Sequence, residues 1–550
     1  MMAVAALLLP SILSALVHPP AVRKPHVRVP PLRMLDTAPA PPPALDQHAQ
    51  RVAKALSASE VERAAYRRGS NRVPNGASAS ARPDLSRLRA ILSVSRDDAT
   101  ITAEPGVTME ELVAAALPLG LLPKVVPEFR GITVGGAIIG GAMESSSFAH
   151  GMFHDTVSSC ELCLPNGTVA VASRSVNADL LAALGGSYGT LASLTAATIE
   201  CVRLPTRSTT AVRVTFEWYA DVAEGVAALN AMARARSCSD GRRIDFLDGV
   251  ALPDGGVLVC IGRLVDDDAE SAVEMWSVGG PGDEFYFEKL LNVRSCLSEG
   301  GGSYDATMSV EDYLFRFDRG AFQVGSASLW LARWHDWLTP TKLALAAASL
   351  REPFNLRALC DPLFETGTMY RRLHSAPPEA IASRMVLQDL FAPEERAAAA
   401  VAFCQQQLTE PPCAIWLWPV RGTDSPAVLA PNGHVDSSQI LVNLGIYTRA
   451  PSSTPGGGID FTRALERWGL ENGCRKLLYS ANYYEAGEMW ATTETPHMYD
   501  KAAYDVLRER TGASSAGQPR IEERVLSVLR QRGNMSPLDA ASVALVEWLL

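Results

Sequence analysis

Hydrophobic and polar positions in the first part of the chain follow two periods, and this pattern predicts a mixture of helices and strands. Residues 46–65 repeat with a helical period, whereas the short apolar runs Ala90–Val94 and Thr100–Ala103 are typical of strands. A turn signal at Pro105-Gly106 is followed by a helical pattern over Met109–Leu117. The order of strand, turn and helix predicts an α+β domain.

A β-hairpin is predicted further along. Ser158–Leu164 and Thr168–Ala172 are expected to be strands, and Asn166-Gly167 between them favours a tight hairpin turn. A helix is expected at Ala178–Leu184 and a strand at Ala197–Val202.

Two glycine-rich segments flank this hairpin. The first glycine segment, residues 122–147, has glycines at 131, 135, 136, 140 and 141, and the second glycine segment is residues 185–190. Glycine lets a backbone approach a ligand closely, and successive N–H groups can bind an anion. Because the first segment fits neither the P-loop nor the Rossmann pattern, a cofactor loop and a glycine-rich packing turn remain alternatives on the residues alone.

The composition excludes some partners. The chain of 550 residues has a net charge of −10, and its apolar content of 47% is enough for two or three domain cores. No long basic run follows the first 35 residues, so a nucleic-acid partner is not expected. Cys160 and Cys163 lack a second pair at zinc spacing and are expected to be strand residues, and no metal site is predicted.

The amino terminus differs from the rest of the chain. Residues 1–17 are apolar and uncharged, basic residues follow, and the first acidic residue is Asp36. The apolar run is shorter than the roughly 20 residues that span a bilayer, so a signal-type or plastid-directing leader and a membrane anchor are alternatives. We expect residues 1–45 to be a targeting or anchor segment with a Pro/Ala linker.

Motifs in a fixed order carry a family resemblance. In the first half they are Thr133-Val134-Gly135-Gly136, Glu144-Ser145-Ser146-Ser147, Gly151, Asn166-Gly167, Asp179-Leu180 and Gly185 to Leu191. This set resembles the PCMH-type FAD-binding domain of the vanillyl-alcohol-oxidase-like flavoproteins. In the second half they are Asp245–Gly249, Tyr313 with Arg316 and Arg319, Leu387–Pro393, Ile415–Pro419 and Leu478–Trp490. The whole order is similar to the delta-24 sterol reductase (Diminuto-like) family.

The resemblance implies two α+β domains and a flavin. Residues 46–210 would be the PCMH-type FAD-binding domain, and residues 211–550 a substrate or cap domain whose last helices pack back on the first. It implies non-covalent FAD, because no histidine lies in a glycine-rich amino-terminal loop. The implied cofactor-binding residues are Thr133, Val134, Gly135, Gly136, Gly140, Gly141, Glu144, Ser145, Ser146, Gly151, Gly185, Gly186, Ser187, Gly189, Thr190 and Ile199. His150 and His154 are expected to be loop residues beside the cofactor.

The resemblance also implies a reaction. NADPH would reduce FAD, and a hydride and a proton would then add to an isolated carbon–carbon double bond of a lipid, expected to be the delta-24 bond of a sterol side chain. Tyr479 is the first candidate for the proton donor, followed by Tyr483 and Glu485, and Arg316 is a candidate contact of FAD or NADPH. The candidate walls of an apolar substrate slot are Trp416, Trp418, Phe391, Tyr447 and Met489.

Other functions remain open. A related enzyme could reduce a methylene-bearing fatty acyl chain, or a flavin oxidase could pass electrons to oxygen. A non-catalytic lipid-binding protein is a further alternative, because Ala192 stands where the family has glycine and residues 66–83 are short for a pyrophosphate-binding subdomain. The expected location is the endoplasmic reticulum membrane, through peripheral or amino-terminal association, with the plastid as the alternative.

Overall fold

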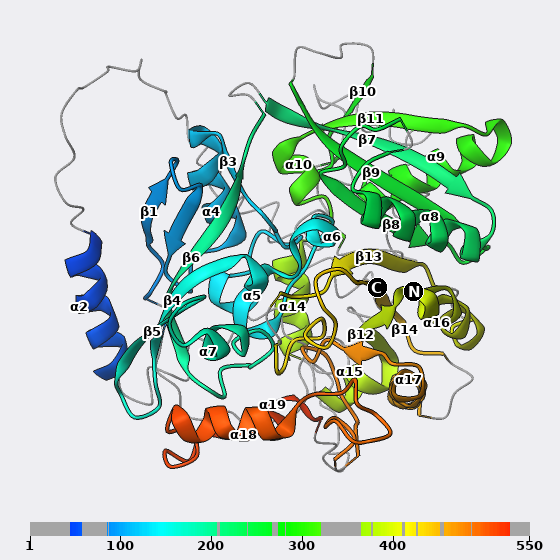
Figure 1. Ribbon diagram of the computed structural model, residues 1–550. Helices are drawn as coiled ribbons and strands as arrows, with labels where there is room; N and C mark the ends of the chain where they lie inside the picture. The colour runs from blue at the N-terminus through cyan, green and yellow to red at the C-terminus, as the bar shows by residue number, and fades with distance from the viewer. Residues whose placement is uncertain are drawn as a thin grey trace, which may run out of the picture. The chain divides into compact units, whose positions relative to one another are not determined.

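The strands of the protein form two separate sheets (Figure 1). The computed structural model describes residues 44–57 and 85–527, except residues 86, 206–208, 239, 267–272, 281, 321–364, 376–377, 410–412, 425–426, 452–455 and 486. The predicted α+β class is confirmed. The targeting or anchor segment predicted for residues 1–45 lies outside the described residues up to residue 43, so it stays a prediction, as does the location that depends on it.

The first sheet is antiparallel, with the order β1-β2-β6-β4-β5 and with β3 paired to β6. Its strands are β1 (Ile91–Ser95), β2 (Thr100–Ala103), β3 (Leu121–Pro123), β4 (Val157–Cys163), β5 (Val169–Ser173) and β6 (Ser193–Arg203). The helices of this part are α2 (Ala44–Ser57), α4 (Met109–Ala116), α5 (Val134–Gly140), α6 (Ser147–His150) and α7 (Ala178–Ala182), with 3₁₀ turns η2 (Leu117–Leu119) and η3 (Phe153–Thr156).

The hairpin prediction is confirmed. β4 and β5 pair antiparallel, and Gly167 supplies the positive φ of +87° that the turn between them requires. Cys160 and Cys163 are free, buried residues of β4, as expected. The helix expected at Met109–Leu117 begins one residue after Thr108, whose side chain caps it in a reciprocal pair with Glu111.

The second sheet has the order β10-β11-β7-β9-β8-β13-β14-β12-β15, and β10 and β11 are its parallel pair. Its strands are β7 (Thr209–Tyr219), β8 (Phe246–Ala251), β9 (Val257–Asp266), β10 (Glu274–Trp276), β11 (Ser303–Ser309), β12 (Met385–Pro393), β13 (Ile415–Arg421), β14 (Ile440–Arg449) and β15 (Arg475–Lys476). The helices are α8 (Val222–Ala235), α9 (Tyr286–Gly300), α10 (Val310–Leu314), α14 (Thr366–Ser375), α15 (Pro378–Arg384), α16 (Glu394–Gln407), α17 (Gly458–Glu471), α18 (Lys501–Arg510) and α19 (Ile521–Val525).

The two faces of the second sheet join different cores. Leu417 of β13 and Leu444 of β14 pack with residues of α8, α16 and α17, among them Leu229, Val401 and Leu465. Alternate residues such as Trp416, Trp418 and Phe391 belong instead to the core that contains the first sheet. Because successive side chains of a strand point to opposite faces, one face of this sheet is turned toward the glycine segments.

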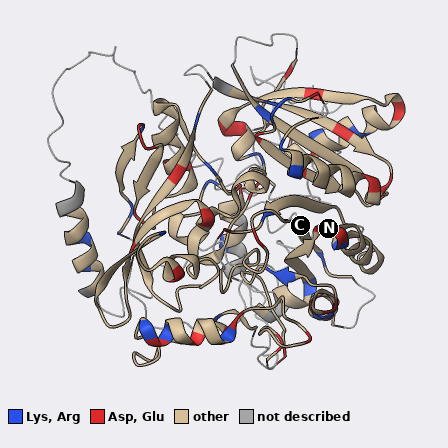
Figure 2. Ribbon diagram, in the orientation of Figure 1, with Lys and Arg blue, Asp and Glu red and all other residues tan. Residues whose placement is uncertain are grey.

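Two short connections tie the halves of the chain together. Phe148 of α6 is fully buried in the core formed by β13, β14 and α8. At the carboxyl end, α18 carries charged residues along its length (Figure 2). Its Arg508 donates to the Thr190 carbonyl at 3.2 Å, and Arg510 pairs with Asp179. The last helices therefore contact the second glycine segment, whereas the predicted domain boundary at residue 210 stays a prediction.

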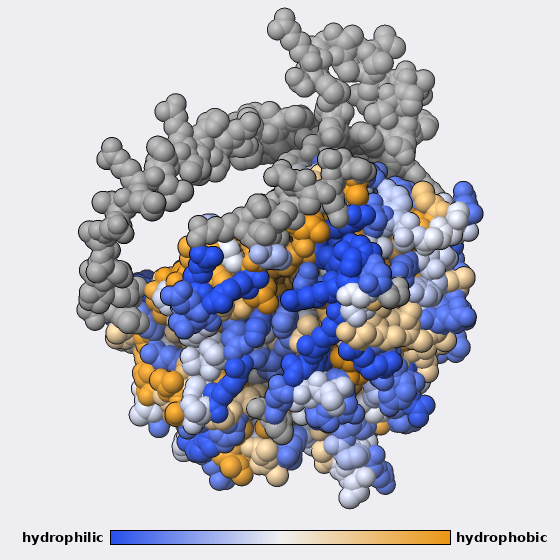
Figure 3. All heavy atoms as spheres, turned by 45° about the horizontal axis from the view of Figure 1, so that its top comes forward, coloured by the Kyte–Doolittle hydropathy of each residue, from blue (hydrophilic) through white to orange (hydrophobic). Residues whose placement is uncertain are grey.

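Within the ranges that the structure describes, no helix is both long and apolar enough to cross a bilayer. On the face that Figure 3 shows, hydrophobic residues lie scattered between hydrophilic ones.

The helix α2 is held on the first sheet by buried charges. His48 contacts Glu104 at 2.7 Å and Glu161 at 3.1 Å, and Arg51 also pairs with Glu104 at 2.7 Å. The hydrogen bond with Glu161 raises the pKa of His48 above its usual 6.5, and the same contact lowers the pKa of Glu161. The helix is therefore docked by a protonated histidine between two carboxylates.

We expect His48→Gln to lower the free energy of unfolding by roughly 1–3 kcal/mol at pH 6, because it removes hydrogen bonds to charged groups. A raised histidine pKa stabilises the folded state fully below about pH 6.5, and this stabilisation is lost as the pH rises through the folded-state value. The difference between the variant and the natural protein should therefore shrink between pH 6 and pH 9 in urea unfolding. An equal difference in the free energy of unfolding at both pH values would contradict this prediction.

Candidate functional site

The two glycine segments lie against each other. The Tyr188 amide donates to the Ile139 carbonyl at 2.9 Å, and the Tyr188 hydroxyl donates to the Gly140 carbonyl, also at 2.9 Å. Tyr188 has a positive φ of +48°, which is strained for a residue with a side chain. The structure therefore holds Tyr188 in an unfavourable conformation in order to join the segments.

Part of the first glycine segment is a helix that the sequence did not predict. Thr133 caps α5 by accepting a hydrogen bond from the Gly136 amide at 3.1 Å, and Val134, Ala137 and Ile138 are buried beneath it. The cap and the burial outweigh the poor helix propensity of glycine. The outer residues Gly136 and Gly140 stay accessible at the surface of this turn.

The residues at the end of α5 fit a ligand that accepts hydrogen bonds. Among the described residues no acceptor pairs with the amides of Gly141 and Ala142, and a side chain at Gly140 would meet no atom within 4 Å. A diphosphate or a flavin ring needs N–H donors on a backbone that it can approach. The predicted FAD therefore fits here, and Gly136, Gly140, Gly141, Ala142 and Gly189 are the residues that would hold it.

The second glycine segment is packed tightly. Gly186 has a φ of +71°, and a Cβ atom there would lie 2.3 Å from the Leu429 carbonyl oxygen, so only glycine fits. The buried His154 ring packs on Gly185 and makes no side-chain hydrogen bond within the described part of the chain. His150 lies in α6, and burial lowers its pKa to about 4 with help from surrounding cations. Both histidines lie beside the glycine segments, and their predicted relation to the cofactor stays a prediction.

A buried ion-pair network anchors the end of the first glycine segment. Arg316 donates to Glu144 at 2.9 Å and to Asp248 of β8 at 2.8 Å, and all three side chains are almost fully buried. Burial raises the pKa of Asp248 to about 6, and the charge of Arg316 opposes the shift. Arg316 also lies 4.2 Å from the ring centre of Tyr313. The sequence offered Arg316 as a contact of FAD or NADPH, whereas the structure places it inside this network.

Serine residues of the first glycine segment join the same network. Ser145 donates to Glu144 through its hydroxyl and its amide, and it accepts from the Tyr313 hydroxyl at 3.2 Å. The Ser145 carbonyl accepts from the Leu247 amide at 2.7 Å. Hydrogen bonds of both its side chains and its backbone therefore hold the segment that precedes α6 against the second sheet.

Tyr479 belongs to a group of carboxyls and phenols that we call the carboxyl–tyrosine cluster, in which Asp389 is buried and the others are partly buried: Glu128, Tyr370, Asp389, Tyr447 and Tyr479. Asp389 of β12 accepts from the Tyr447 hydroxyl at 3.0 Å and from the Asn443 amide at 2.7 Å. Burial and then the Asp389 charge raise the pKa of Tyr479 well above its usual 10. Tyr479 therefore keeps its proton at any physiological pH.

The other two predicted catalytic residues lie apart from Tyr479. The Tyr483 amide donates to Glu466 at 2.8 Å behind the strand β15. Glu485 is exposed and pairs with Arg463 at 3.1 Å. The buried Lys476 donates to Glu466 at 2.9 Å and to the Ala481 carbonyl at 3.0 Å, so Glu466 binds both Lys476 and the Tyr483 amide.

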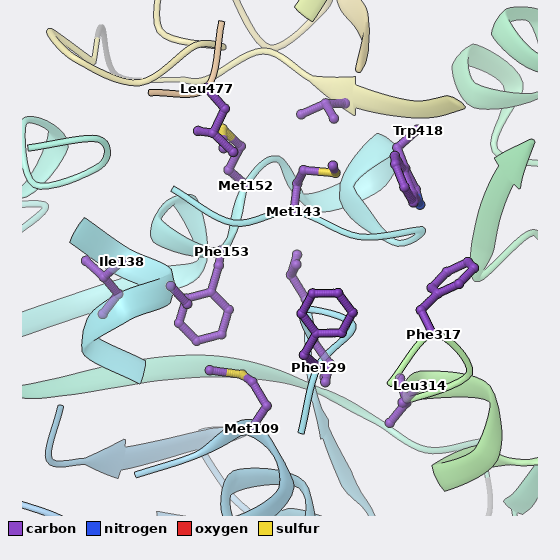
Figure 4. Packing of buried hydrophobic residues seen from close by; sticks show 14 of the residues in the cluster. Met109, Phe129, Ile138, Met143, Met152, Phe153, Leu314, Phe317, Trp418 and Leu477 are labelled. Atoms are coloured by element: carbon purple, nitrogen blue, oxygen red, sulfur yellow. The ribbon is translucent and has the colours of Figure 1, made fainter. Parts of the chain in front are cut away.

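The first glycine segment and the carboxyl–tyrosine cluster meet. A Cβ atom at Gly141 would lie 2.9 Å from a methyl carbon of Leu477, which is two residues before Tyr479. Figure 4 shows Leu477 directed toward Met152 and Met143, with Phe129 and Trp418 further along the same core. A ligand on Gly140 and Gly141 would therefore lie near the wall that holds Tyr479.

Aromatic residues continue this wall. Trp416 and Trp418 stack with ring centres 6.2 Å apart, and Phe317 packs edge-on to Trp416 at 4.9 Å. Phe391 and Met489 are buried in the same core, and Tyr447 is partly buried beside it. The structure thus brings all five predicted slot residues to one core.

The remaining predicted cofactor residues are mostly buried. Ser146, Gly151 and Ser187 are buried near the glycine segments, and the Thr190 hydroxyl donates to the Ser187 carbonyl at 2.8 Å. Ile199 lies in the middle of β6 with no exposed surface. Sequence reasoning missed Asp389 and Glu128 as members of the site, and the only signal for Asp389 was its position in the Leu387–Pro393 motif.

Comparisons with known proteins find an FAD-binding family and a group of sterol reductases. Residues 43–173 match the family model described as FAD binding domain. The chain is 25% identical over 451 residues to the Delta(24)-sterol reductase of Homo sapiens, covering 80% of this chain and 77% of that protein. It is 23% identical over 454 residues to the Delta(24)-sterol reductase of Pisum sativum, covering 78% of this chain and 74% of that protein.

The chain has an FAD-binding domain and is similar to the delta(24)-sterol reductases over about four-fifths of its length. The resemblance predicted from the motifs is therefore confirmed. A decaprenylphosphoryl-beta-D-ribose oxidase of Mycolicibacterium smegmatis is 34% identical, but over 118 residues and 21% of this chain. The findings support an FAD-dependent oxidoreductase.

We expect Arg316→Met to lower the free energy of unfolding by about 3–5 kcal/mol, because it leaves Glu144 and Asp248 buried without a cation. FAD affinity should fall with it, since Glu144 and Ser145 end the first glycine segment. Urea unfolding and flavin titration measure the two effects.

The matched variant replaces all three charges together, as Arg316→Met with Glu144→Gln and Asp248→Asn. It should regain much of the lost stability, because no unpaired charge remains buried. If the single variant unfolds at the same urea concentration as the natural protein, the network does not contribute the stability that we assign to it.

Proposed function

We propose that the protein is an FAD-dependent, NADPH-driven reductase of an isolated carbon–carbon double bond in a lipid, namely the delta-24 double bond of a sterol side chain. The similarity to delta(24)-sterol reductases over about four-fifths of the chain supports the substrate class. The observation that supports the proposal is the contact of Gly141 with Leu477, because Leu477 precedes Tyr479 by two residues and the segment that fits FAD therefore meets the segment that carries Tyr479.

The reduction of an isolated carbon–carbon double bond requires a particular protein environment. It has no carbonyl oxygen on which charge could be stabilised, so a proton must reach one carbon as a hydride reaches the other. FAD, when bound, supplies the hydride chemistry. The protein must then hold the lipid, exclude water and present one O–H group to the alkene.

Tyr479 is the group that we assign to proton donation. Its pKa is raised by burial and by Asp389, so the phenol is protonated and fixed in place at the start of each turnover. The proposal does not use Glu485, which is exposed in surface ion pairs, or Tyr483, whose amide donates to Glu466.

The aromatic wall suits a sterol side chain. Trp416, Trp418 and Phe317 form one packed group on the face of the second sheet that Asp389 shares. Flat aromatic and aliphatic surfaces bind lipids by excluding water and impose no charge on them. We propose that the lipid lies along this group with its double bond toward Tyr479.

The first experiment is the absorbance spectrum of the purified, FAD-loaded protein under anaerobic conditions. NADPH should bleach the flavin band, and a delta-24 sterol such as desmosterol should restore it. Restoration only by a methylene-bearing fatty acyl lipid would replace the sterol assignment, and rapid restoration by oxygen alone would indicate an oxidase. Failure to bind FAD, with retained sterol binding, would favour the non-catalytic alternative and overturn the proposal.

Tyr479→Phe should slow the sterol-dependent restoration of the flavin band by about 100-fold or more, as expected for the loss of a general acid. The bleaching by NADPH should keep its rate, because that step needs no proton from Tyr479. Tyr219→Phe, which removes a phenol bound to Glu217 on the other side of the second sheet, is the matched control. Equal slowing of both steps in Tyr479→Phe would show a structural defect instead.

A further inference from the structure

Two buried arginines flank the second glycine segment, and no part of the proposed function has used them. Arg475 of β15 is 4% exposed, and Arg508 of α18 is 3% exposed. Neither forms an ion pair with a carboxylate of the described residues, and both donate instead to uncharged oxygens. Two positive charges are therefore buried beside this segment without a paired anion.

Among the described residues, Arg475 donates to backbone carbonyls alone. Its guanidinium donates to the Ala430 carbonyl at 2.9 Å and to the Met498 carbonyl at 2.6 Å, and its Nε also donates to the carbonyl of His497. The guanidinium lies 4.8 Å from the ring centre of Tyr499. Carbonyl dipoles and an aromatic face satisfy the N–H groups, but they do not neutralise the charge.

The Ala430 carbonyl belongs to a loop that packs on the second glycine segment. A Cβ atom at Gly186 would lie 2.3 Å from the Leu429 oxygen and 3.4 Å from the Ala430 nitrogen. Asn432 of the same loop donates through its side-chain amide to Asp155 at 2.8 Å. The backbone of this loop therefore connects the Arg475 guanidinium with the segment.

Arg508 contacts the other end of the segment directly. It donates to the Thr190 carbonyl at 3.2 Å, and it also donates to the carbonyls of Gln518 at 2.6 Å and Pro519 at 3.0 Å. The Tyr504 hydroxyl lies 3.5 Å away. The buried Nε atom of Arg508 has no hydrogen-bond partner within the described part of the chain. Arg508 thus resembles Arg475 in being held by oxygens that carry no full charge.

Carboxylates near the two arginines are not paired with them. Asp500 acts on Arg475 through its charge, without an ion pair. Asp505 of α18 pairs with Lys501 and with Arg520 instead. A buried cation without a paired anion is unfavourable in the ligand-free protein. The binding of an anion beside the two arginines would therefore be favoured.

The second glycine segment is where such an anion would lie. Gly189 is its partly exposed residue, whereas the other residues of the segment are buried. It stands between Gly186, which packs on the Arg475 loop, and Thr190, which Arg508 binds. FAD, which fits the glycine segments, carries one negative charge on each of its two phosphates. Opposite charges attract over several ångströms where little water screens them.

We propose that Arg475 and Arg508 are positioning residues that stabilise the FAD diphosphate at the second glycine segment by their charges, acting through the backbone of Ala430 and Thr190. Backbone amides of the glycine segments then supply the hydrogen bonds, and the arginines supply the opposite charge. This inference rests on the FAD binding that is part of the proposed function, and it depends on neither the lipid nor NADPH.

The test is a flavin titration of the full-length protein after removal of FAD. Arg475→Gln and Arg508→Gln should each weaken FAD binding by about 10-fold, and the double variant by about 100-fold, because two separate charges are lost. Arg475→Lys and Arg508→Lys should retain most of the affinity, since they keep the charge but lose part of the hydrogen bonding. The matched control is Arg510→Gln, which should leave the affinity unchanged, because Arg510 lies on α18 but is exposed and pairs with Asp179.

Riboflavin separates the role of charge from a role in folding, because it has the flavin ring without phosphates. Its affinity should be the same in the natural protein and in both Gln variants. A loss of riboflavin affinity equal to the loss of FAD affinity would show a structural defect and overturn the inference. A loss of FAD affinity of about 10-fold or more in the Lys variants would overturn it independently, even where a Gln variant does not fold.

The outcomes distinguish this inference from the proposed function. An unchanged FAD affinity in the double Gln variant would overturn the role of the arginines and leave the reductase proposal standing. A natural protein that binds FAD, but whose reduced flavin is reoxidised by no lipid, would overturn the reductase proposal and leave the role of the arginines standing.

Discussion

The buried pairing of Arg316 with Glu144 and Asp248 is the interaction on which the site depends. Glu144 ends the first glycine segment, Asp248 belongs to a central strand of the second sheet, and Arg316 follows α10. Removing charges from water is costly, and these are retained because each has partners of opposite sign or donors within reach. The pairing fixes the segment that fits FAD at one place on the sheet that carries the substrate wall. The backbone bond from Leu247 to Ser145 and the burial of Phe148 in the second core act in the same direction.

The second sheet contributes to two cores because successive side chains along each of its strands point to opposite faces. One face packs on α8, α16 and α17 and stabilises the sheet. The opposite face carries Asp248, Trp416, Trp418, Asn443, Tyr447 and Asp389, a mixture of aromatic and polar groups that would be unfavourable in an ordinary core. The polar members are tolerated because Asn443 and Tyr447 donate to Asp389 and because Asp248 pairs with Arg316.

The pKa values of the tyrosine and carboxyl groups in the cluster depend on their surroundings more than on their residue type. Asp389 gains donors from Asn443 and Tyr447, whereas Glu128 gains neighbouring negative charge. Burial is the largest cause of the raised pKa of both carboxyls, and neighbouring groups then shift each pKa differently. A reductase of an unactivated alkene must deliver the proton from a side chain, because its substrate has no polar group beside the double bond. The dependence on buried acids thus follows from the chemistry of the proposed substrate.

The sequence by itself determined the local elements and the family. The β4–β5 hairpin follows from Asn166-Gly167, and α4 follows from the capping pair of Thr108 and Glu111, because these signals act within a few residues. The helix α5 could not be predicted, since burial of Val134 and Ile138 overrides the glycines. Tertiary structure alone decided that Tyr479 lies beside Asp389 while Glu485 lies at the surface. These relations depend on sheet pairing and on buried charges from segments distant in the chain, and no local pattern records which distant residue will supply a partner.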